Sequence, residues 1–181
     1  MYALAAIAAT TAAYLFVYRQ DGGLPSASHL FGHGIGVVGF VFMLMTETLY
    51  SLRKRSTSAR WGSMSSWLRF HMFTGMVGPY MVLLHPAMRF RGLAGVVALL
   101  TLVVVASGLI GRYIYTSVPR VLEGPVIEER PADRQHGRNG VTVTRRALAT
   151  WRTIHVPLTL LLFLIASAHI VGAIYYATFL R

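Results

Sequence analysis

Long apolar runs are the feature that most restricts how this chain can fold. Its 181 residues are 55% hydrophobic and only 13% charged, and a soluble domain of this length cannot hide so much apolar side chain. About 20 consecutive apolar residues span the hydrocarbon core of a bilayer as a helix. The sequence therefore predicts an all-α integral membrane protein with five transmembrane helices, at Met1–Tyr18, Leu30–Leu52, Leu68–Met88, Leu93–Tyr115 and Ile154–Leu180.

The first run raises the question of a secretory signal. Such a signal carries basic residues before its apolar segment, and no Lys or Arg precedes the run at Met1–Tyr18. We therefore expect a membrane helix there, peripheral to a four-helix core formed by the other runs. The expected single domain comprises residues 1–29 (N-terminal helix and outer loop), 30–115 (helices two to four), 116–153 (cytoplasmic loop) and 154–181 (helix five).

The basic residues are placed unevenly along the chain. Of the 17 Lys and Arg residues, 13 lie in segments 51–67 and 116–153 or at Arg69 and Arg112. Cytoplasmic loops of membrane proteins carry such an excess, so we place these segments inside, with the N-terminus inside and the C-terminus outside. The net charge of +11 is then matched to anionic lipid headgroups of a bacterial plasma membrane, and no nucleic-acid partner is expected.

Segment 116–153 is the one sizeable polar stretch. It mixes acidic and basic residues with several prolines and glycines, and it is too polar and too short for a separate folded domain. We expect a loop with local turns, in which Thr144–Trp151 begins a helix that continues into the last membrane span.

Two pairs of histidines repeat one spacing. His71 and His85 stand 14 residues apart, and so do His155 and His169. Seven histidines in 181 residues would give roughly 0.25 such pairs by chance, whereas two occur and both lie within predicted spans. Fourteen residues are close to four helical turns, so each pair shares a helix face with about 21 Å between its members.

The predicted topology matches the two pairs by depth. One helix separates the third and fifth spans, so these two run in the same direction. His71 and His155 then lie near the cytoplasmic side, and His85 and His169 lie toward the outer side. Two ligands per level on facing helices suit a large planar macrocycle, so we expect two non-covalent b haems, each between two histidines.

Other metal chemistry fits this pattern less well. Structural zinc needs four ligands in a tetrahedron, and histidines about 21 Å apart on one helix cannot share an ion. The chain contains no cysteine, which excludes cysteine-ligated iron–sulfur clusters and covalently attached haem.

Further residues are expected to contact the haems. Gly75 lies four residues after His71, and Gly78 lies three residues after Gly75. Both therefore share the helix face of His71 and leave room for a bulky cofactor. Haem propionates are anionic, and the planar guanidinium of arginine binds carboxylates through two hydrogen bonds. The candidate propionate partners are Arg69, Arg112 and Arg152 on the inner side and Arg89 and Arg91 on the outer side.

Several polar and aromatic residues allow two interpretations. Glu47, the only acidic residue in a predicted span, is either a proton carrier beside a quinone site or an ion-pair partner for Arg53 or Arg69. His33 is either a hydrogen-bond donor to a propionate or quinone, or an interfacial residue. We expect interfacial aromatics at Tyr113, Tyr115, Tyr175, Tyr176 and Trp151.

On these residues the chain resembles the b-type cytochromes of quinol–cytochrome c reductases, which carry two similarly spaced histidines on each of two parallel helices. It is also similar to the membrane part of ferric reductases and NADPH oxidases. The resemblance covers roughly Leu30 to Leu180 and implies two bis-histidine b haems. It is carried by Phe70-His71, Gly75, Leu84-His85, Ile154-His155 and Ala168-His169.

The chain also departs from both families. It has fewer helices than the quinol reductase cytochromes and lacks their Pro-Glu-Trp-Tyr run. No Gly-x-Gly-x-x-Gly follows a predicted strand, and 116–153 cannot house a dinucleotide-binding domain. The sequence therefore cannot take hydride from a nicotinamide unaided.

The resulting main hypothesis is transmembrane electron transfer, with the chain serving as a cytochrome b subunit beside other membrane or peripheral redox subunits. Two alternatives stay open. One is a stand-alone quinol- or metal-reducing oxidoreductase, with a quinone bound beside one haem. The other is a non-redox bundle whose histidines conduct protons.

Overall fold

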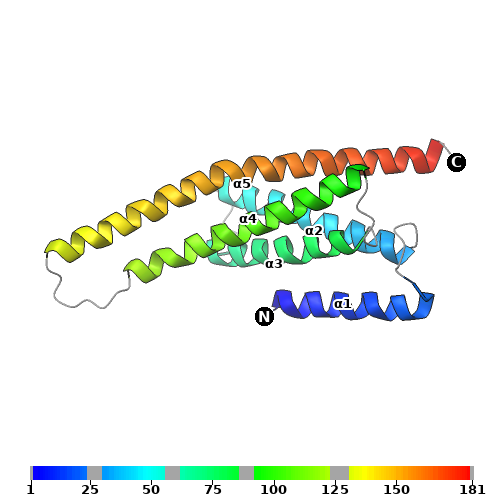
Figure 1. Ribbon diagram of the computed structural model, residues 1–181, viewed down its shortest axis with the longest axis horizontal. Helices are drawn as coiled ribbons and strands as arrows, with labels where there is room; N and C mark the ends of the chain where they lie inside the picture. Colours follow the sequence, from blue (N-terminus) through cyan, green and yellow to red (C-terminus); the bar gives the residue numbers. More distant parts are fainter. Residues whose placement is uncertain (1, 24–29, 56–61, 86–91, 123–130, 180–181) are drawn as a thin grey trace. The chain divides into compact units, whose positions relative to one another are not determined.

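The described part of the chain is helical, and the expected all-α class is confirmed. The computed structural model describes residues 2–23, 30–55, 62–85, 92–122 and 131–179, and no strand occurs among them. The five helices found in these ranges are α1 (Tyr2–Asp21), α2 (Leu30–Arg55), α3 (Met64–Leu84), α4 (Gly92–Leu122) and α5 (Pro131–Phe179) (Figure 1).

Four of these helices are long and apolar enough to cross a membrane. They are α1, α2, α4 and α5, so four of the five predicted spans are confirmed as membrane-compatible helices. The exception, α3, has 21 residues and is about 32 Å long, which suffices for the hydrocarbon core. Arg69, His71 and Pro79 make α3 less apolar, and its passage through the membrane stays a prediction.

The predicted loop over 116–153 is largely helical, and that prediction is wrong for most of its length. Helix α4 continues to Leu122 and α5 begins at Pro131. Extending an existing helix adds one hydrogen bond per residue without a new nucleation step, so the polar continuations of apolar helices remain helical. Proline suits the first position of a helix because its missing N–H has no partner there in any case.

The length of α5 follows from the same effect. It has 49 residues, which at 1.5 Å per residue is about 74 Å, more than twice the roughly 30 Å of a hydrocarbon core. The expected helix at Thr144–Trp151 is confirmed as part of α5. A large part of α5 therefore lies beyond any membrane span that it forms.

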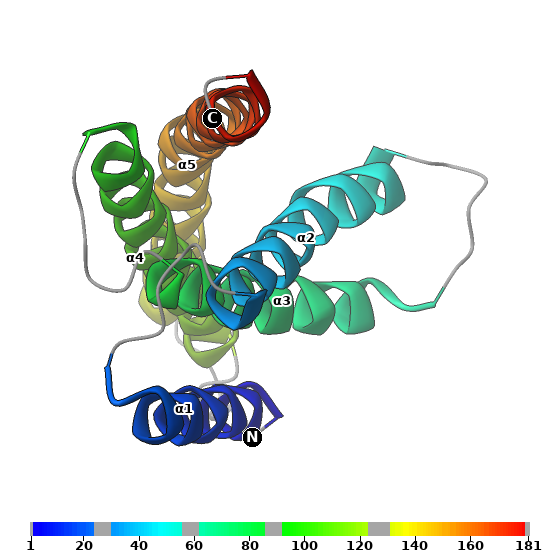
Figure 2. The same cartoon turned by 90° about the vertical axis from the view of Figure 1, so that its right-hand side faces the viewer.

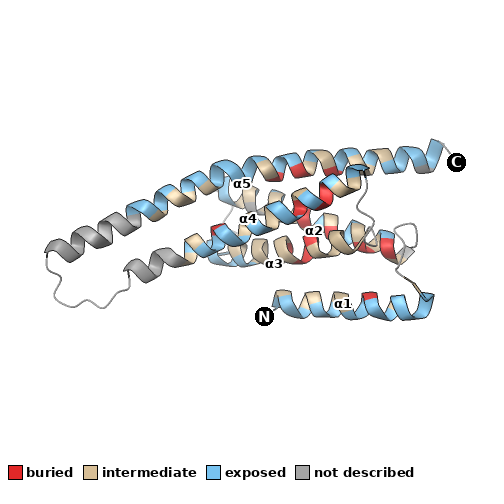
Figure 3. Ribbon diagram, viewed as in Figure 1, coloured by how far each residue is buried: buried red, intermediate tan, exposed pale blue. Residues whose placement is uncertain are grey.

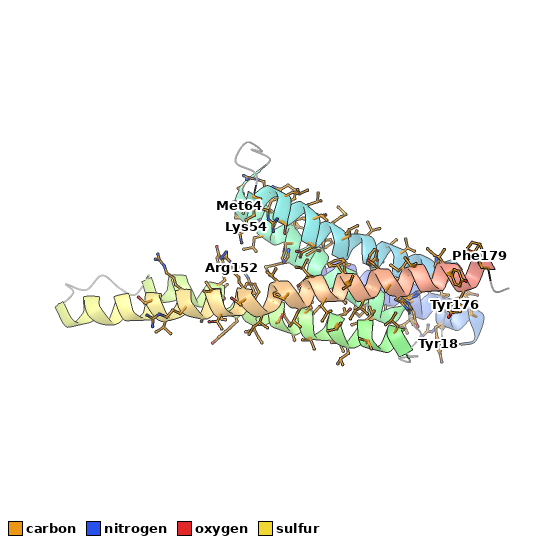
Figure 4. All side chains as sticks on the ribbon, turned by 90° about the horizontal axis from the view of Figure 1, so that it is seen from above. Tyr18, Lys54, Met64, Arg152, Tyr176 and Phe179 are labelled. Atoms are coloured by element: carbon orange, nitrogen blue, oxygen red, sulfur yellow. The ribbon has the colours of Figure 1, made fainter. Side chains whose placement is uncertain are left out.

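The chain divides into two compact units, Met1–Ala98 and Leu99–Arg181. In the first unit α2 and α3 are antiparallel neighbours. A Cβ at Gly39 would lie 2.8 Å from the carbonyl oxygen of Gly78, and one at Gly78 would lie 2.9 Å from that of Gly39. Small residues allow this close approach of two membrane helices. The helices cross and then diverge toward the C-terminal end of α2 (Figure 2), and Lys54 and Met64 mark that end of the pair (Figure 4).

Helix α1 lies against α3 with most of its surface exposed (Figure 3). A hydrogen bond joins Thr11 Oγ1 of α1 to Tyr80 Oη of α3 at 2.6 Å. Thr11 donates its own hydroxyl proton to the carbonyl of Ile7, so Tyr80 is the donor. Phe16 on α1 is 63% exposed, which suits contact with lipid rather than with water.

In the second unit α4 and α5 are also antiparallel. Ser107 of α4 contacts His155 of α5, and Gly111, one turn further along α4, contacts Trp151, one turn earlier on α5. Thr101 on α4 is completely buried. The second unit is thus a helical hairpin with a side-chain site near its middle.

Candidate metal centre around the paired histidines

His71 lies on α3 and faces α2. Its Nδ1 atom is 3.2 Å from the backbone oxygen of Thr46. A carbonyl oxygen only accepts hydrogen bonds, so the proton of a neutral His71 is on Nδ1. The lone pair that can bind a metal is then on Nε2.

His85 follows the last residue of α3 and also faces α2. Its Nδ1 atom is 2.8 Å from the backbone oxygen of Gly32, so the same reasoning puts the lone pair on Nε2. A Cβ at Gly36 would lie 2.6 Å from Cγ of the His85 ring, so the absence of a side chain at Gly36 leaves the space that the imidazole occupies. The exposed ring of His33 is nearby, with its centroid 6.3 Å from that of His85.

His155 lies on α5 and faces α4. Its Nδ1 atom is 2.6 Å from Oγ of Ser107, and the hydroxyl of Ser107 donates to the carbonyl of Val104 at 2.9 Å. A serine hydroxyl has one proton, so Oγ accepts from Nδ1–H of His155. A Cβ at Gly108 would be 3.7 Å from Cε1 of the ring, which is ordinary contact.

His169 lies half-buried on α5, 14 residues after His155. Thr159, Leu162 and Ala166 follow one another between the two histidines at helical spacings of four and three, so they share the face of His155 and His169. Thr159 is 8% exposed, Leu162 1% and Ala166 6%, while Leu160, Leu161 and Leu164 are exposed. The face of α5 that carries His155 and His169 is therefore its more buried face.

Three of the four paired histidines thus share one arrangement. Each directs Nδ1 to an oxygen of the neighbouring helix, at Thr46, Gly32 and Ser107. Metal-ligating histidines almost always donate their other ring N–H in this way, which fixes the tautomer and raises the basicity of the ligating nitrogen. The donor set therefore fits a metal bound through Nε2. His71 and His85 belong to the first unit and His155 and His169 to the second, so the pairing between them stays a prediction.

In the structure Gly75 and Gly78 both lie on the side of α3 that faces α2. A Cβ at Gly75 would be 3.4 Å from Cγ2 of Thr46, and one at Gly78 would be 3.0 Å from Cβ of Phe42. The close approach of α2 explains Gly78, whereas a Cβ at Gly75 would reach Thr46 only at the edge of ordinary contact distance. Their predicted contact with a haem stays a prediction.

Three of the candidate propionate partners lie in the described residues. Arg69, Arg112 and Arg152 are exposed. Arg69 donates to Oγ of Ser66 at 3.1 Å, and the guanidinium carbon of Arg112 is 5.9 Å from the ring centroid of Tyr115. Arg89 and Arg91 lie outside the described residues, and all five stay predictions.

Glu47 is half-buried on α2. Of its two expected ion-pair partners, Arg53 donates to the carbonyl of Gly62 at 3.3 Å and Arg69 to Ser66. Both interpretations of Glu47 therefore stay open. His33, by contrast, is adjacent to His85, so it belongs to the surroundings of a candidate ligand.

The sequence interpretation missed the roles of Ser107 and Trp151. Trp151 was expected to be an interfacial aromatic, but it is half-buried and stacks on His155 with ring centroids 4.8 Å apart and an interplanar angle of 23°. The sequence does indicate this contact, because α3 and α5 each carry a tryptophan four residues before the first paired histidine, at Trp67 and Trp151. Residues four apart are neighbours on a helix surface.

No preformed metal cluster is found among the described residues, where no three His, Asp or Glu side chains come together. Comparison with protein-family models, with curated proteins and with solved structures returned no match to this chain.

Proposed function

We propose that this chain is a dihaem b-type cytochrome that transfers electrons across a bacterial plasma membrane. In this proposal His71 and His155 hold the inner haem, and His85 and His169 hold the outer haem. The observation that carries the proposal is the shared donation from Nδ1 of His71, His85 and His155 to an oxygen of the neighbouring helix. Such donation is characteristic of histidines that bind a metal through Nε2.

A haem between two histidines supplies reversible one-electron transfer and has no open coordination position for oxygen. In this proposal the oxygens of Thr46, Gly32 and Ser107 hold the imidazoles in place through their Nδ1–H groups. Thr74 on α3 is 2% exposed, and Leu162 on α5 is 1% exposed. This function needs no proton donor or nucleophile at the iron.

The proposal requires α3 to cross the membrane beside the four more apolar helices. Its 21 residues are long enough to cross the hydrocarbon core. Its less apolar composition comes partly from His71, which is half-buried, and Pro79, which is buried. A polar side chain in a membrane helix is costly unless it faces the protein interior. A role as a haem ligand would explain why His71 is present in a membrane helix despite this cost.

The proposed direction of the helices follows from charge. Basic residues Arg53, Lys54 and Arg55 end α2, and Arg145 and Arg146 lie on the polar part of α5. Cytoplasmic placement of these residues agrees with the positive-inside rule. The inner haem would then lie near the cytoplasm and the outer haem near the opposite face.

The electrons would come from a partner or from a quinol, because the sequence given contains no nicotinamide or flavin motif. We therefore place the chain as a cytochrome b subunit of a larger membrane redox complex. Its expected contacts are other membrane or peripheral redox subunits and the lipid bilayer.

The test is the reduced-minus-oxidised absorbance spectrum of the protein purified from its native membrane in mild detergent. We expect b-type alpha bands and two haems per chain. Replacing His85 with alanine should remove one haem and leave the other, because the two sites share no ligand. A colourless preparation would instead favour the proton-conducting bundle, and quinol turnover by the isolated chain would favour the stand-alone oxidoreductase.

A further inference from the structure

The support of His155 differs in kind from that of the other two histidines. His71 and His85 donate to backbone carbonyls, which every residue at Thr46 or Gly32 would also offer. His155 donates to the side-chain hydroxyl of Ser107 at 2.6 Å. This is therefore the one of the three bonds that depends on the identity of a side chain.

Trp151 completes the support of the same imidazole. Its indole stacks on His155 with centroids 4.8 Å apart, and its Nε1–H donates to the backbone oxygen of Ser107 at 2.7 Å. Ser107 thus binds His155 through its hydroxyl and Trp151 through its carbonyl. The two contacts hold both the plane and the Nδ1 edge of the His155 ring.

A glycine makes the space for this arrangement. Gly111 is buried, and a Cβ there would overlap the six-membered ring of the Trp151 indole. A side chain at Gly111 would therefore push the indole from the position in which it stacks on His155 and donates to Ser107. A substitution at Gly111 can therefore displace the Trp151 indole while Trp151, Ser107 and His155 themselves stay unsubstituted.

We propose that Ser107 and Trp151 are positioning residues for the haem ligand His155: Trp151 fixes the plane of the imidazole, and the hydrogen bond to Ser107 sets the reduction potential of the haem bound by His155. The inference rests on the proposed function. A hydrogen bond from Nδ1–H makes the imidazole a stronger electron donor, which stabilises ferric iron and lowers the reduction potential. Because a side chain supplies this bond, substitution at Ser107 changes one haem and leaves the other with its backbone-supported ligand.

The first experiment is a potentiometric titration of the purified haem-loaded protein. Ser107→Ala should shift one of the two midpoint potentials upward and leave the other in place. Ser107→Thr retains a hydroxyl and should restore the original value. Ser167→Ala, at an exposed serine of the same helix as His155, is the matched control and should change neither potential.

A second experiment reports the orientation of the imidazole. Low-spin ferric haem has electron paramagnetic resonance g-values that depend on the planes of its two axial ligands. Trp151→Phe removes the Nε1–H donor, and Gly111→Ala displaces the indole, so each should alter one of the two haem signals. Gly172→Ala, where a Cβ meets nothing within 4 Å, should alter neither.

The outcomes separate the two proposals. Two haems in the wild type with unchanged potentials in Ser107→Ala and unchanged signals in Trp151→Phe would overturn the positioning role and leave the cytochrome assignment standing. Loss of one haem in Ser107→Ala that Ser107→Thr restores would support the positioning role. A wild-type protein without haem would overturn both.

Discussion

At the residue scale, the imidazole rings are held by hydrogen bonds to the neighbouring helix, and at His85 also by the small size of one neighbour. Gly36 leaves the volume that the ring of His85 occupies, whereas a Cβ at Gly108 would make only ordinary contact with the ring of His155. Each ring then directs Nδ1 to an oxygen on the adjacent helix. The position of His85, a candidate ligand, therefore depends on the absence of a side chain at Gly36.

Gly36→Ala tests this arrangement at His85. The new Cβ would lie 2.6 Å from Cγ of the ring, so the imidazole must move and lose its bond to Gly32. We expect the haem content of the purified protein to fall from two per chain toward one, measured as the pyridine haemochrome.

The matched control is Gly34→Ala on the same helix, where a Cβ meets nothing within 4 Å. It should keep both haems. Equal haem content in the two variants would contradict the proposed ligand role of His85.

The residue scale is also where sequence reasoning was least complete. The spacing of His71, His85, His155 and His169 could be read directly, because it depends on helical periodicity alone. The hydroxyl of Ser107 could not be assigned to His155, since the two residues are 48 positions apart and nothing local specifies which helix faces which.

At the element scale, the apolar runs predicted all five helices, because hydrophobic length is a property of the sequence itself. Their ends were predicted less well. Segment 116–153 was expected to form a loop, whereas α4 and α5 continue through most of it. The polar composition of this segment shows that it is unsuited to the membrane interior, but it does not show whether an existing helix ends where the chain enters water.

Gly78→Ala tests the packing of α2 against α3. The added Cβ would lie 2.9 Å from the carbonyl oxygen of Gly39, and the opposing backbone cannot move as a side-chain tip can. Overpacking of this kind costs about 1–3 kcal/mol, so we expect the midpoint of thermal unfolding in mild detergent to fall.

Gly172→Ala is the control for this prediction, because its Cβ enters open space and alanine favours a helix by up to about 1 kcal/mol over glycine. Its stability should be equal to or above that of the wild type. A Gly78→Ala protein as stable as Gly172→Ala would contradict the close contact of the two backbones.

At the scale of the whole molecule, the proposed topology places the C-terminal end of α1 and the polar part of α5 on opposite sides of the membrane. The chain contains no cysteine, so a single introduced cysteine reports the side on which it lies. Val143, on the polar part of α5, is 65% exposed. A Cβ at Gly23, just beyond α1, meets nothing within 4 Å.

We expect Gly23→Cys to react with a membrane-impermeant maleimide in cells whose plasma membrane is accessible from outside. Val143→Cys should react only in inverted vesicles, because basic segments remain in the cytoplasm. Reaction of both cysteines from the same side would contradict the proposed topology.

The most direct measurement of the central claim is electron transfer across a sealed bilayer. The haem-loaded protein is reconstituted in vesicles that contain ferricyanide, a membrane-impermeant reductant is added outside, and loss of ferricyanide absorbance is followed. We predict oxidation of the external reductant at the expense of internal ferricyanide for the wild type, and a rate equal to that of protein-free vesicles for His85→Ala. A wild type whose haems become reduced while the internal ferricyanide persists at the protein-free rate would contradict the account.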